Sequence, residues 1–378
     1  MDLRPALQAL PGEVDRLWVA YSAGIDSVAL LHLLQPFREH YELGLWHVHH
    51  GLQPNADAMA EQARIAARRY GIECRIDRLR LDPDQPNLEA TAREARYRLF
   101  ADGLDARSAL LTAHHRDDQA ETLLLALMRG AGPAGLAGIA RLRPLGRGWL
   151  LRPLLDMTRR DIHNCVREAG LDWVEDPSNV ELHADRNFLR HRVLPLLSER
   201  WPAAASSLKQ AADWQSETAG LLTQLARMDA RHCLIDRPFA EQLCVDLDSL
   251  QKLNAARQKN LLRHWLLQAG HAIDRRRLEQ LVEQSGARED AQPEVRLATA
   301  VLRRYRGAWY LCALHEEAPD RDVVCRDTLP LAVQKRNRHR LKRLFQQAGV
   351  PPWRRGRIPL RMEGDRVVGL ERSYSSGR

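Results

Sequence analysis

One strand–turn–helix stretch near the N-terminus restricts the fold more than any other part of the chain. An apolar run with strand character, Leu17–Tyr21, stops at a turn of small residues, and a helix-like apolar run follows at once. This layout turns backbone N–H groups and the positive end of a helix toward one point, where an anion can bind. Ser22 and Ser27 add hydroxyl donors for phosphate oxygens. Asp26 would repel a bare phosphate, so its presence indicates a divalent cation between the two.

The stretch lacks the lysine and the second glycine of the G-x-x-x-x-G-K-[ST] phosphate loop, and an ordinary turn stays an alternative. After it, strand-like and helix-like stretches alternate through the first half of the chain. That alternation predicts an α/β domain with a doubly wound parallel sheet. The expected strands are residues 18–21, 44–48, 73–76 and 109–113, and the expected helices are 27–39, 56–70, 88–106 and 117–129.

Polar clusters follow three of these strands, at Ser22–Ser27, His47–His50 and His114–Asp118. The carboxyl ends of parallel strands meet at one edge of a sheet, where ligands bind. We therefore expect the three clusters to converge on one site. The histidines are candidate zinc ligands, but a zinc centre needs three neutral ligands and an ordered surrounding shell. In a phosphate site they serve more simply as hydrogen-bond donors.

Three acidic residues, Asp117, Asp118 and Glu121, lie at the start of the helix expected over 117–129. Carboxylates at this position stabilise a helix dipole, and that alone would explain them. Three acids beside two histidines are more than capping needs. The pattern therefore favours a role in holding a hydrated Mg²⁺ or a cationic amine.

Length and charge predict a three-part chain. A sequence of 378 residues is too long for one ordinary domain. We expect a catalytic domain at residues 1–200, a mainly helical domain at 201–325, and a small α+β domain at 326–378. The last of these holds 14 basic and 4 acidic residues, and the rest of the chain sums to −2. Such segregated charge favours a phosphate-backbone partner, although a solvated basic tail stays an alternative.

Within the later parts, the sequence predicts helices throughout residues 203–285 and β-structure at 296–313 and 322–333. A helix at 338–348 and a hairpin at 357–370 complete the expectation. The six cysteines form no C-x-x-C pair, which is typical of a reducing cytoplasm. The sequence shows no apolar run of membrane-spanning length and no signal-peptide pattern. We expect a cytoplasmic protein with no membrane contact.

The loop at residues 22–27 resembles the S-G-G-x-D-S loop of the PP-loop ATP pyrophosphatases, which cut ATP between its α and β phosphates. Ala23 stands where that pattern has its first glycine. If the position requires a positive φ, alanine costs about 1 kcal/mol there. The resemblance implies that ATP and Mg²⁺ bind at this loop, with Asp26 as the metal ligand. The residues it places around the nucleotide are Ser22, Ala23, Gly24, Ile25, Asp26, Ser27, His47 and His50.

Taken in order, further segments resemble the bacterial tRNA(Ile)-lysidine synthases. The most specific are Ala92–Tyr97, Thr112–Thr122 and the basic Pro-Pro-Trp segment at Leu341–Leu360. Others are Arg129–Gly138, Arg152–Leu155, Asp176–Asn179 and Arg186–Arg190. The resemblance is dense over residues 18–200, weak over 203–325, and clear again over 341–360. His49 and a rather short C-terminal part also depart from the family pattern.

The resemblance implies a two-step reaction on the wobble cytidine of a tRNA(Ile) with a CAU anticodon. ATP first adenylates the C2 oxygen, and the amine of L-lysine then displaces AMP. The implied catalytic residues are Asp26, Arg93, His114 and Arg186. The implied substrate-binding residues are Arg96, Asp118, Glu121 and Arg190, with Trp353, Arg354, Arg355 and Arg357 for the tRNA body.

Two other functions remain as alternatives. One is a different PP-loop activity, such as a tRNA thiolase or an amide-forming synthetase. Thiolation is disfavoured because Cys74 and Cys165 form no recognisable pair. The other is a tRNA-binding protein whose ATP site has decayed, which the retention of Asp26 and both serines disfavours. The sequence leaves the oligomeric state open, with a homodimer among the alternatives.

Overall fold

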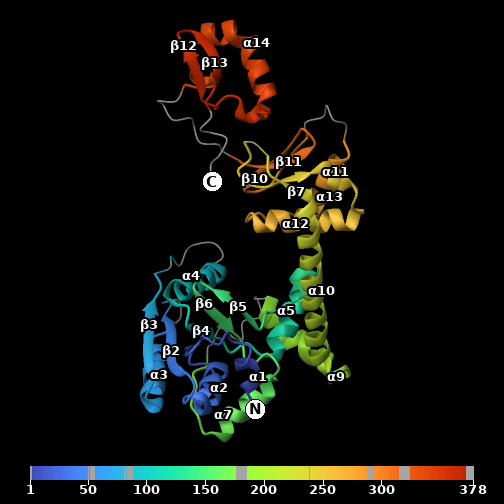
Figure 1. The fold of residues 1–378 in the computed structure, drawn as a ribbon. Coiled ribbons are helices and arrows are strands. Elements are labelled where there is room, and N and C mark those ends of the chain that lie inside the picture. The colour runs from blue at the N-terminus through green and yellow to red at the C-terminus, as the bar shows by residue number, and fades with distance from the viewer. Residues whose placement is uncertain are drawn as a thin grey trace. The chain divides into compact units, whose positions relative to one another are not determined.

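The computed structural model describes residues 2–49, 51, 56–80, 82, 88–175, 185–237, 239–287, 293–314 and 324–371. The chain forms two compact units, Met1–Ala219 and Gly220–Arg378. The division falls inside one long helix, α10 (Ala204–Cys233), of 30 residues (Figure 1).

A six-stranded sheet with the order β3–β2–β1–β4–β6–β5 forms the centre of the first unit. All neighbouring strands are parallel except β5 and β6, which form an antiparallel hairpin. The predicted doubly wound parallel sheet is therefore confirmed. The strands are β1 (Arg16–Ala20), β2 (Glu42–His49), β3 (Glu73–Arg78), β4 (Ser108–Leu111), β5 (Leu142–Leu145) and β6 (Gly148–Leu151).

Helices cover both faces of this sheet. Alternate strand residues point to opposite sides, and the apolar side chains on both sides are buried against helices. Leu17 and Val19 of β1 belong to one buried cluster, and Trp18 between them belongs to another. The first cluster packs against α2, α3 and α7, and the second against α4. The helices are α1 (Arg4–Leu7), α2 (Ile25–Leu34), α3 (Ala56–Tyr70), α4 (Leu88–Gly103), α5 (Arg116–Met128), α6 (Pro133–Leu136), α7 (Arg159–Glu168), α8 (Asp185–Phe188) and α9 (Leu194–Arg200), with a 3₁₀ turn at Gln35–Phe37 and a π-helical turn at Leu189–Val193.

The strand order reverses between β1 and β4, which are neighbours in the sheet. The turn at Ser22–Gly24 follows β1, and His114 and His115 follow β4. Ligands of such sheets bind at this reversal, beyond the carboxyl ends of the strands. The fold thus brings two of the three predicted polar clusters to one point.

The second unit contains an antiparallel sheet with the order β7–β8–β11–β10–β9. Trp309 and Leu311 of β11 face the core formed with the helices, and Tyr310 and Cys312 lie in a cluster on the other side. The strands are β7 (Leu234–Ile235), β8 (Cys244–Asp246), β9 (Glu294–Arg296), β10 (Ala300–Tyr305) and β11 (Ala308–Ala313), and the helices are α11 (Leu247–Gln251), α12 (Ala255–Gln268) and α13 (Arg275–Ser285).

The C-terminal segment of this unit has a small core of its own. Leu341 and Phe345 of α14 (Leu331–Gln347) pack against Val367 of a two-stranded hairpin, β12 (Leu360–Glu363) and β13 (Arg366–Leu370). Short 3₁₀ turns at Arg326–Thr328 and Pro352–Arg354 connect these elements. The predicted hairpin at 357–370 is confirmed.

Two expectations about secondary structure are wrong, and one hairpin was not predicted. Residues 203–285 are not helical throughout, because β7 and β8 interrupt them, and strands of two or three residues are too short to show an alternating pattern. Of the expected β-segment at 322–333, the described part (324–333) contains a 3₁₀ turn and the start of α14, and no strand. The apolar residues after Pro330 resemble a strand, but they are the first turn of a helix. The β5–β6 hairpin was not predicted.

Candidate active site

The loop after β1 is built around its two serines. The hydroxyl of Ser27 donates to the carbonyl of Gly24 at 2.9 Å and accepts the backbone N–H of Ser22 at 3.2 Å. Ala23 has a φ of 62°, the left-handed region that favours glycine. The strain expected at this position is therefore present. The side chain of Ile25 is buried in the core, so Ile25 can contact a ligand only through its backbone N–H.

Asp26 extends from the first turn of α2 toward His115. The Oδ1 atom of Asp26 is buried and accepts no hydrogen bond, and it lies 3.9 Å from Nε2 of His115. Burial raises the pKa of this carboxyl group. No three His, Cys, Asp or Glu side chains of the described ranges converge as a metal centre. A Mg²⁺ ion requires less, because it keeps several waters and takes one or two carboxylates beside phosphate oxygens. The orphaned oxygen of Asp26 fits that requirement.

Of the two predicted histidines on the β2 side, His47 is described and His50 lies outside the described residues. His47 is buried, and its Nδ1 lies 2.8 Å from the carbonyl oxygen of Tyr21. Burial lowers the pKa of the His47 imidazole, so the ring is neutral at pH 7. His47 thus supports the strand end that leads into the loop.

The start of α5 gathers four predicted residues into one charged network. Glu121 is 0% exposed, and its two carboxylate oxygens accept from Nε of Arg186 at 2.8 Å and Nε of Arg190 at 2.7 Å. Arg190 also donates to Asp118 at 3.0 Å, and Arg186 donates to Thr122 at 3.2 Å. Arg190 lies in the π-helical turn, an irregularity frequent at functional sites. The four residues come together as predicted, but Glu121 is enclosed by its arginines.

Of the two predicted arginines of α4, Arg93 acts electrostatically on His114, and Arg96 lies near Arg93 and Tyr97. Arg93 is exposed, and its guanidinium carbon is 5.2 Å from the ring centroid of Tyr97. Burial and the charge of Arg93 lower the pKa of Arg96. Burial, together with the charges of Arg152, Arg186 and Arg93, lowers the pKa of His114 to about 3. His114 is therefore a neutral imidazole, whose Nδ1 lies 2.9 Å from the hydroxyl of Thr112.

The predicted tRNA-binding residues of the C-terminal segment have partners within their own unit. The ring of Trp353 lies 6.0 Å from that of Tyr305 and 5.5 Å from that of Tyr310. Arg354 pairs with Glu241, and Nε of Arg355 donates to a backbone carbonyl at 3.1 Å. Arg357 also makes contacts.

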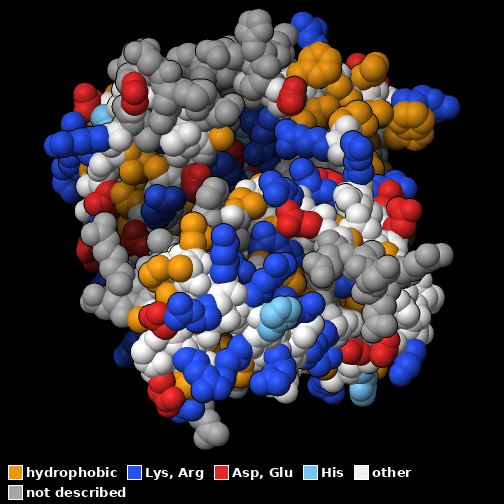
Figure 2. Space-filling view, turned by 90° about the horizontal axis from the view of Figure 1, so that it is seen from above, with side chains coloured by type: hydrophobic (Ala, Val, Ile, Leu, Met, Phe, Trp, Pro, Cys, Tyr) orange, Lys and Arg blue, Asp and Glu red, His pale blue; other side chains and the backbone are white. Residues whose placement is uncertain are grey.

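Most exposed basic residues of this segment lie on α14 and include Lys335, Arg336, Arg338, Lys342 and Arg343. Figure 2 shows a face of the molecule on which Lys and Arg side chains are dense.

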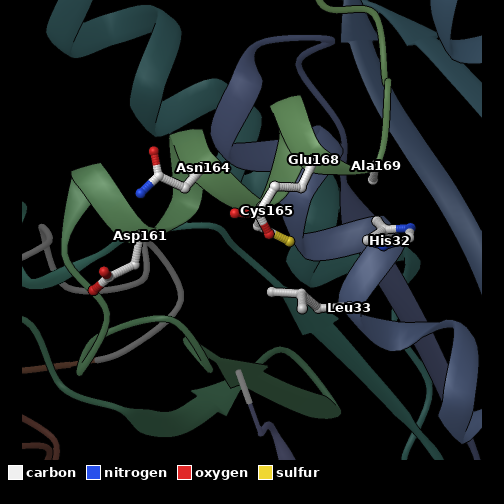
Figure 3. A pocket seen from close by; sticks show the side chains of 7 residues that line it. All are labelled: His32, Leu33, Asp161, Asn164, Cys165, Glu168 and Ala169. Atoms are coloured by element: carbon white, nitrogen blue, oxygen red, sulfur yellow. The ribbon is translucent and has the colours of Figure 1, made fainter.

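A separate pocket of about 510 Å³ lies between α2 and α7 (Figure 3). His32 and Leu33 contribute from the last turns of α2, the end of that helix far from the loop. The pocket is therefore distinct from the sheet edge. Its other lining residues are Asp161, Asn164, Cys165, Glu168 and Ala169.

Comparison with known proteins identifies the family. Residues 5–197 match the family model described as PP-loop domain, residues 246–310 match TilS substrate binding domain, and residues 327–370 match TilS substrate C-terminal domain. The tRNA(Ile)-lysidine synthase of Alkalilimnicola ehrlichii is 41% identical over 96% of this chain and 90% of its own length. The chain belongs to the tRNA(Ile)-lysidine synthase family.

Other relatives in the tRNA(Ile)-lysidine synthase family agree. That of Pseudomonas syringae pv. tomato is 38% identical over 96% of this chain and 90% of its own. Among solved structures, the U34-tRNA thiolase NcsA from Methanococcus maripaludis covers 57% of this chain and 77% of its own, at a TM-score of 0.49 and 17% identity. The domain boundaries at residues 200/201 and 325/326 stay predictions.

In this member of the lysidine synthase family, sequence reasoning placed His115 in the polar cluster His114–Asp118 but did not name it among the candidate site residues. It is 2% exposed, with ring nitrogens 3.5 Å from Asp117 and 3.6 Å from Asp118, besides the contact to Asp26. Burial disfavours the imidazolium, but the close carboxylates of Asp117, Asp118 and Asp26 outweigh it and raise the pKa of His115. The three acids that follow the pair His114-His115 were the available signal.

None of the helices in the described ranges has both the length and the apolar character that a membrane span needs.

Proposed function

We propose that this chain is a cytoplasmic ligase that joins free L-lysine to C2 of the wobble cytidine in a tRNA(Ile) with a CAU anticodon. ATP would be converted to AMP and pyrophosphate. The observation that carries the proposal is the loop after β1, with the orphaned carboxylate oxygen of Asp26 facing His115 at the strand-order reversal. The names of the relatives support the choice of reaction.

The loop would receive the phosphates of ATP. The first turn of α2 has no side-chain cap at Gly24, which leaves the N–H groups of Ile25 and Asp26 available beside the loop. Asp26 would hold Mg²⁺ through Oδ1, and the bound ion would supply charge neutralisation for the phosphate oxygens. His115, placed between Asp26 and the acids of α5, would fix the orientation of the Asp26 carboxylate.

In the first step, the C2 oxygen of the cytidine attacks the α-phosphorus and the bond to the β-phosphate oxygen breaks, which releases pyrophosphate. Negative charge spreads over the phosphoryl oxygens as this happens. Arg93, Arg96 and Arg186 are the groups we propose to stabilise it. His114 is neutral, so it would act as a hydrogen-bonding group and not as a fixed positive charge. The base must leave the anticodon stack to reach this site.

In the second step, the lysine amine attacks C2, the C2–O bond breaks, AMP leaves, and the amine loses a proton. We propose Asp118 as the carboxylate that receives a lysine ammonium group, because its side chain is 11% exposed and it lies at the helix start. Glu121 was predicted to share this role. Its enclosure by Arg186 and Arg190 leads us to propose that it positions those two arginines instead.

Pyrophosphate release tests the proposal directly. We expect the purified chain to release pyrophosphate when ATP is added with a CAU-anticodon tRNA(Ile), and to incorporate labelled lysine into that tRNA. Asp26→Asn should stop pyrophosphate release while the circular dichroism spectrum stays unchanged. Release by the variant within about tenfold of the parent, about 1.4 kcal/mol of barrier, would contradict the role of Asp26. Absence of any tRNA-dependent release by the parent chain would contradict the function.

A further inference from the structure

Four arginines surround Tyr97 at the same edge of the sheet, and we call them the Tyr97 arginine cluster: Arg93, Arg96, Arg143 and Arg152. The guanidinium carbons of Arg93 and Arg143 lie 5.2 Å and 5.5 Å from the centroid of the tyrosine ring. Tyr97 partly offsets the lowering of the pKa of Arg152 and of Arg96 by burial, which places both guanidinium groups near the tyrosine. Two of the four, Arg143 and Arg152, come from the β5–β6 hairpin that the sequence did not reveal.

The cluster has no counter-charge in the described part of the chain, where none of its members pairs with an aspartate or glutamate. Arg152 is only 4% exposed; it donates to the carbonyl of Ala140 at 2.5 Å, and its Nε is buried without a partner. Burial lowers the pKa of Arg152 and of Arg96. A buried cation without a partner is costly by several kcal/mol. Arg186 and Arg190, a short distance along the same edge, do have carboxylate partners.

The position of the cluster separates it from the nucleotide loop. Arg152 directly follows β6, which pairs with β4, and β4 pairs on its other side with β1 and its loop. Neighbouring strands are about 4.8 Å apart, so the end of β6 is about 10 Å from the end of β1. Phosphates held by Ser22 and Ser27 would therefore lie beside Arg152 and not against it.

We propose that Arg143 and Arg152 of the Tyr97 arginine cluster bind the RNA backbone phosphates that flank the wobble cytidine, next to Arg93 and Arg96, which we assign above to the phosphoryl group. A single-stranded loop presents one phosphate per nucleotide, so it can satisfy several arginines at once. A guanidinium group that lies against an aromatic ring still has its planar N–H donors available, so it can donate two parallel hydrogen bonds to one phosphate. The proposal rests on the proposed function, since it assumes an anticodon loop as the substrate.

The test measures binding of a fluorescent 17-nucleotide CAU anticodon stem-loop by anisotropy across a salt series. Arg143→Gln should weaken binding about tenfold and reduce the log–log salt slope by about 0.7 to 1. ATP affinity, measured by equilibrium dialysis, should stay within about twofold. Arg147→Gln is the matched control, because Arg147 is exposed at the turn of the same hairpin and lies outside the cluster. It should leave both affinities unchanged.

A second stem-loop with a GAU anticodon separates phosphate contacts from base recognition. Phosphate contacts carry no sequence information, so Arg143→Gln should weaken both stem-loops by the same factor. That result supports RNA phosphate binding at the Tyr97 arginine cluster, whether or not the parent chain modifies either RNA. If the parent chain modifies neither RNA, the proposed function fails but this inference stands. Loss of ATP affinity with unchanged RNA binding would overturn the inference, as would equal behaviour of Arg143→Gln and Arg147→Gln. Arg152→Lys, which keeps the charge, should bind RNA better than Arg152→Gln at equal circular dichroism.

Discussion

Replacement of Glu121 by glutamine tests how much the buried charge network contributes to the first unit. The change removes one negative charge from a carboxylate that is 0% exposed and accepts two arginine hydrogen bonds, at 2.8 Å and 2.7 Å. Breaking a buried ion pair by removing one partner costs about 3–5 kcal/mol. Arg190 keeps Asp118 and Arg186 keeps Thr122, and both arginines are partly exposed. We therefore expect the low end, about 3 kcal/mol of the free energy of unfolding.

The chain offers a matched control in Glu61, which also pairs with two arginines. Its carboxylate lies 3.0 Å from Arg64 and 2.9 Å from Arg68, but its side chain is 51% exposed. Exposed pairs contribute about 0–1 kcal/mol. Glu61→Gln should therefore change the stability of the same unit little, although the same chemical groups are exchanged. The difference between the two variants measures the effect of burial.

Urea unfolding read by peptide-resolved hydrogen exchange is the appropriate assay, because the two units need not unfold together. The amides of α5 report the free energy of the first unit directly. Equal destabilisation by Glu121→Gln and Glu61→Gln would refute the reasoning from burial. The double variant Glu121→Gln with Arg190→Gln should lose less free energy of unfolding than the two single variants lose together, because it leaves fewer charges unpaired.

Three further outcomes are expected. Ala23→Gly should change the free energy of unfolding by less than about 1 kcal/mol in thermal melts, because relief of the left-handed strain offsets the lost methyl burial and the freer unfolded chain. His114 has a folded pKa of about 3 against 6.5 unfolded, so protonation of the unfolded state lowers stability as the pH falls below 6.5. His114→Asn should remove about 2 kcal/mol of the loss measured between pH 8 and pH 5. Lys342→Gln with Arg343→Gln on α14 should weaken tRNA binding about tenfold in filter assays and reduce the salt slope by about 2, with ATP affinity unchanged.

The sequence was sufficient to predict that polar clusters converge at one edge of the sheet, because its signals are local and periodic. A strand, a small-residue turn and a helix are adjacent in the chain, so the loop at Ser22–Ser27 could be placed without knowledge of distant contacts. The positive φ of Ala23 followed from the glycine that the loop pattern has there. Convergence with His114 followed from the rule that parallel strands end at one edge.

The remaining features depend on contacts between residues far apart in sequence. Nothing near Glu121 shows that arginines about 65 residues later enclose it. Arg143 and Arg152 lie on strands of four residues or just beyond them, which are too short to give a periodic signal. Trp353 follows two prolines in a basic segment, and only the tertiary structure shows that it packs on Tyr305 and Tyr310.

The packing of Trp353 has a consequence for thiol chemistry. Trp353 packs against the cluster that contains Cys244 and Cys312, and burial raises the pKa of the Cys244 thiol to about 12. A thiol in that state is almost free of reactive thiolate at neutral pH. If the C-terminal segment detaches, Cys244 loses part of its cover and alkylates faster. The rate of alkylation at Cys244 therefore reports how often Trp353 and the C-terminal segment leave the β7–β11 sheet, and a chain cut before residue 326 would expose that sulfur on an apolar face.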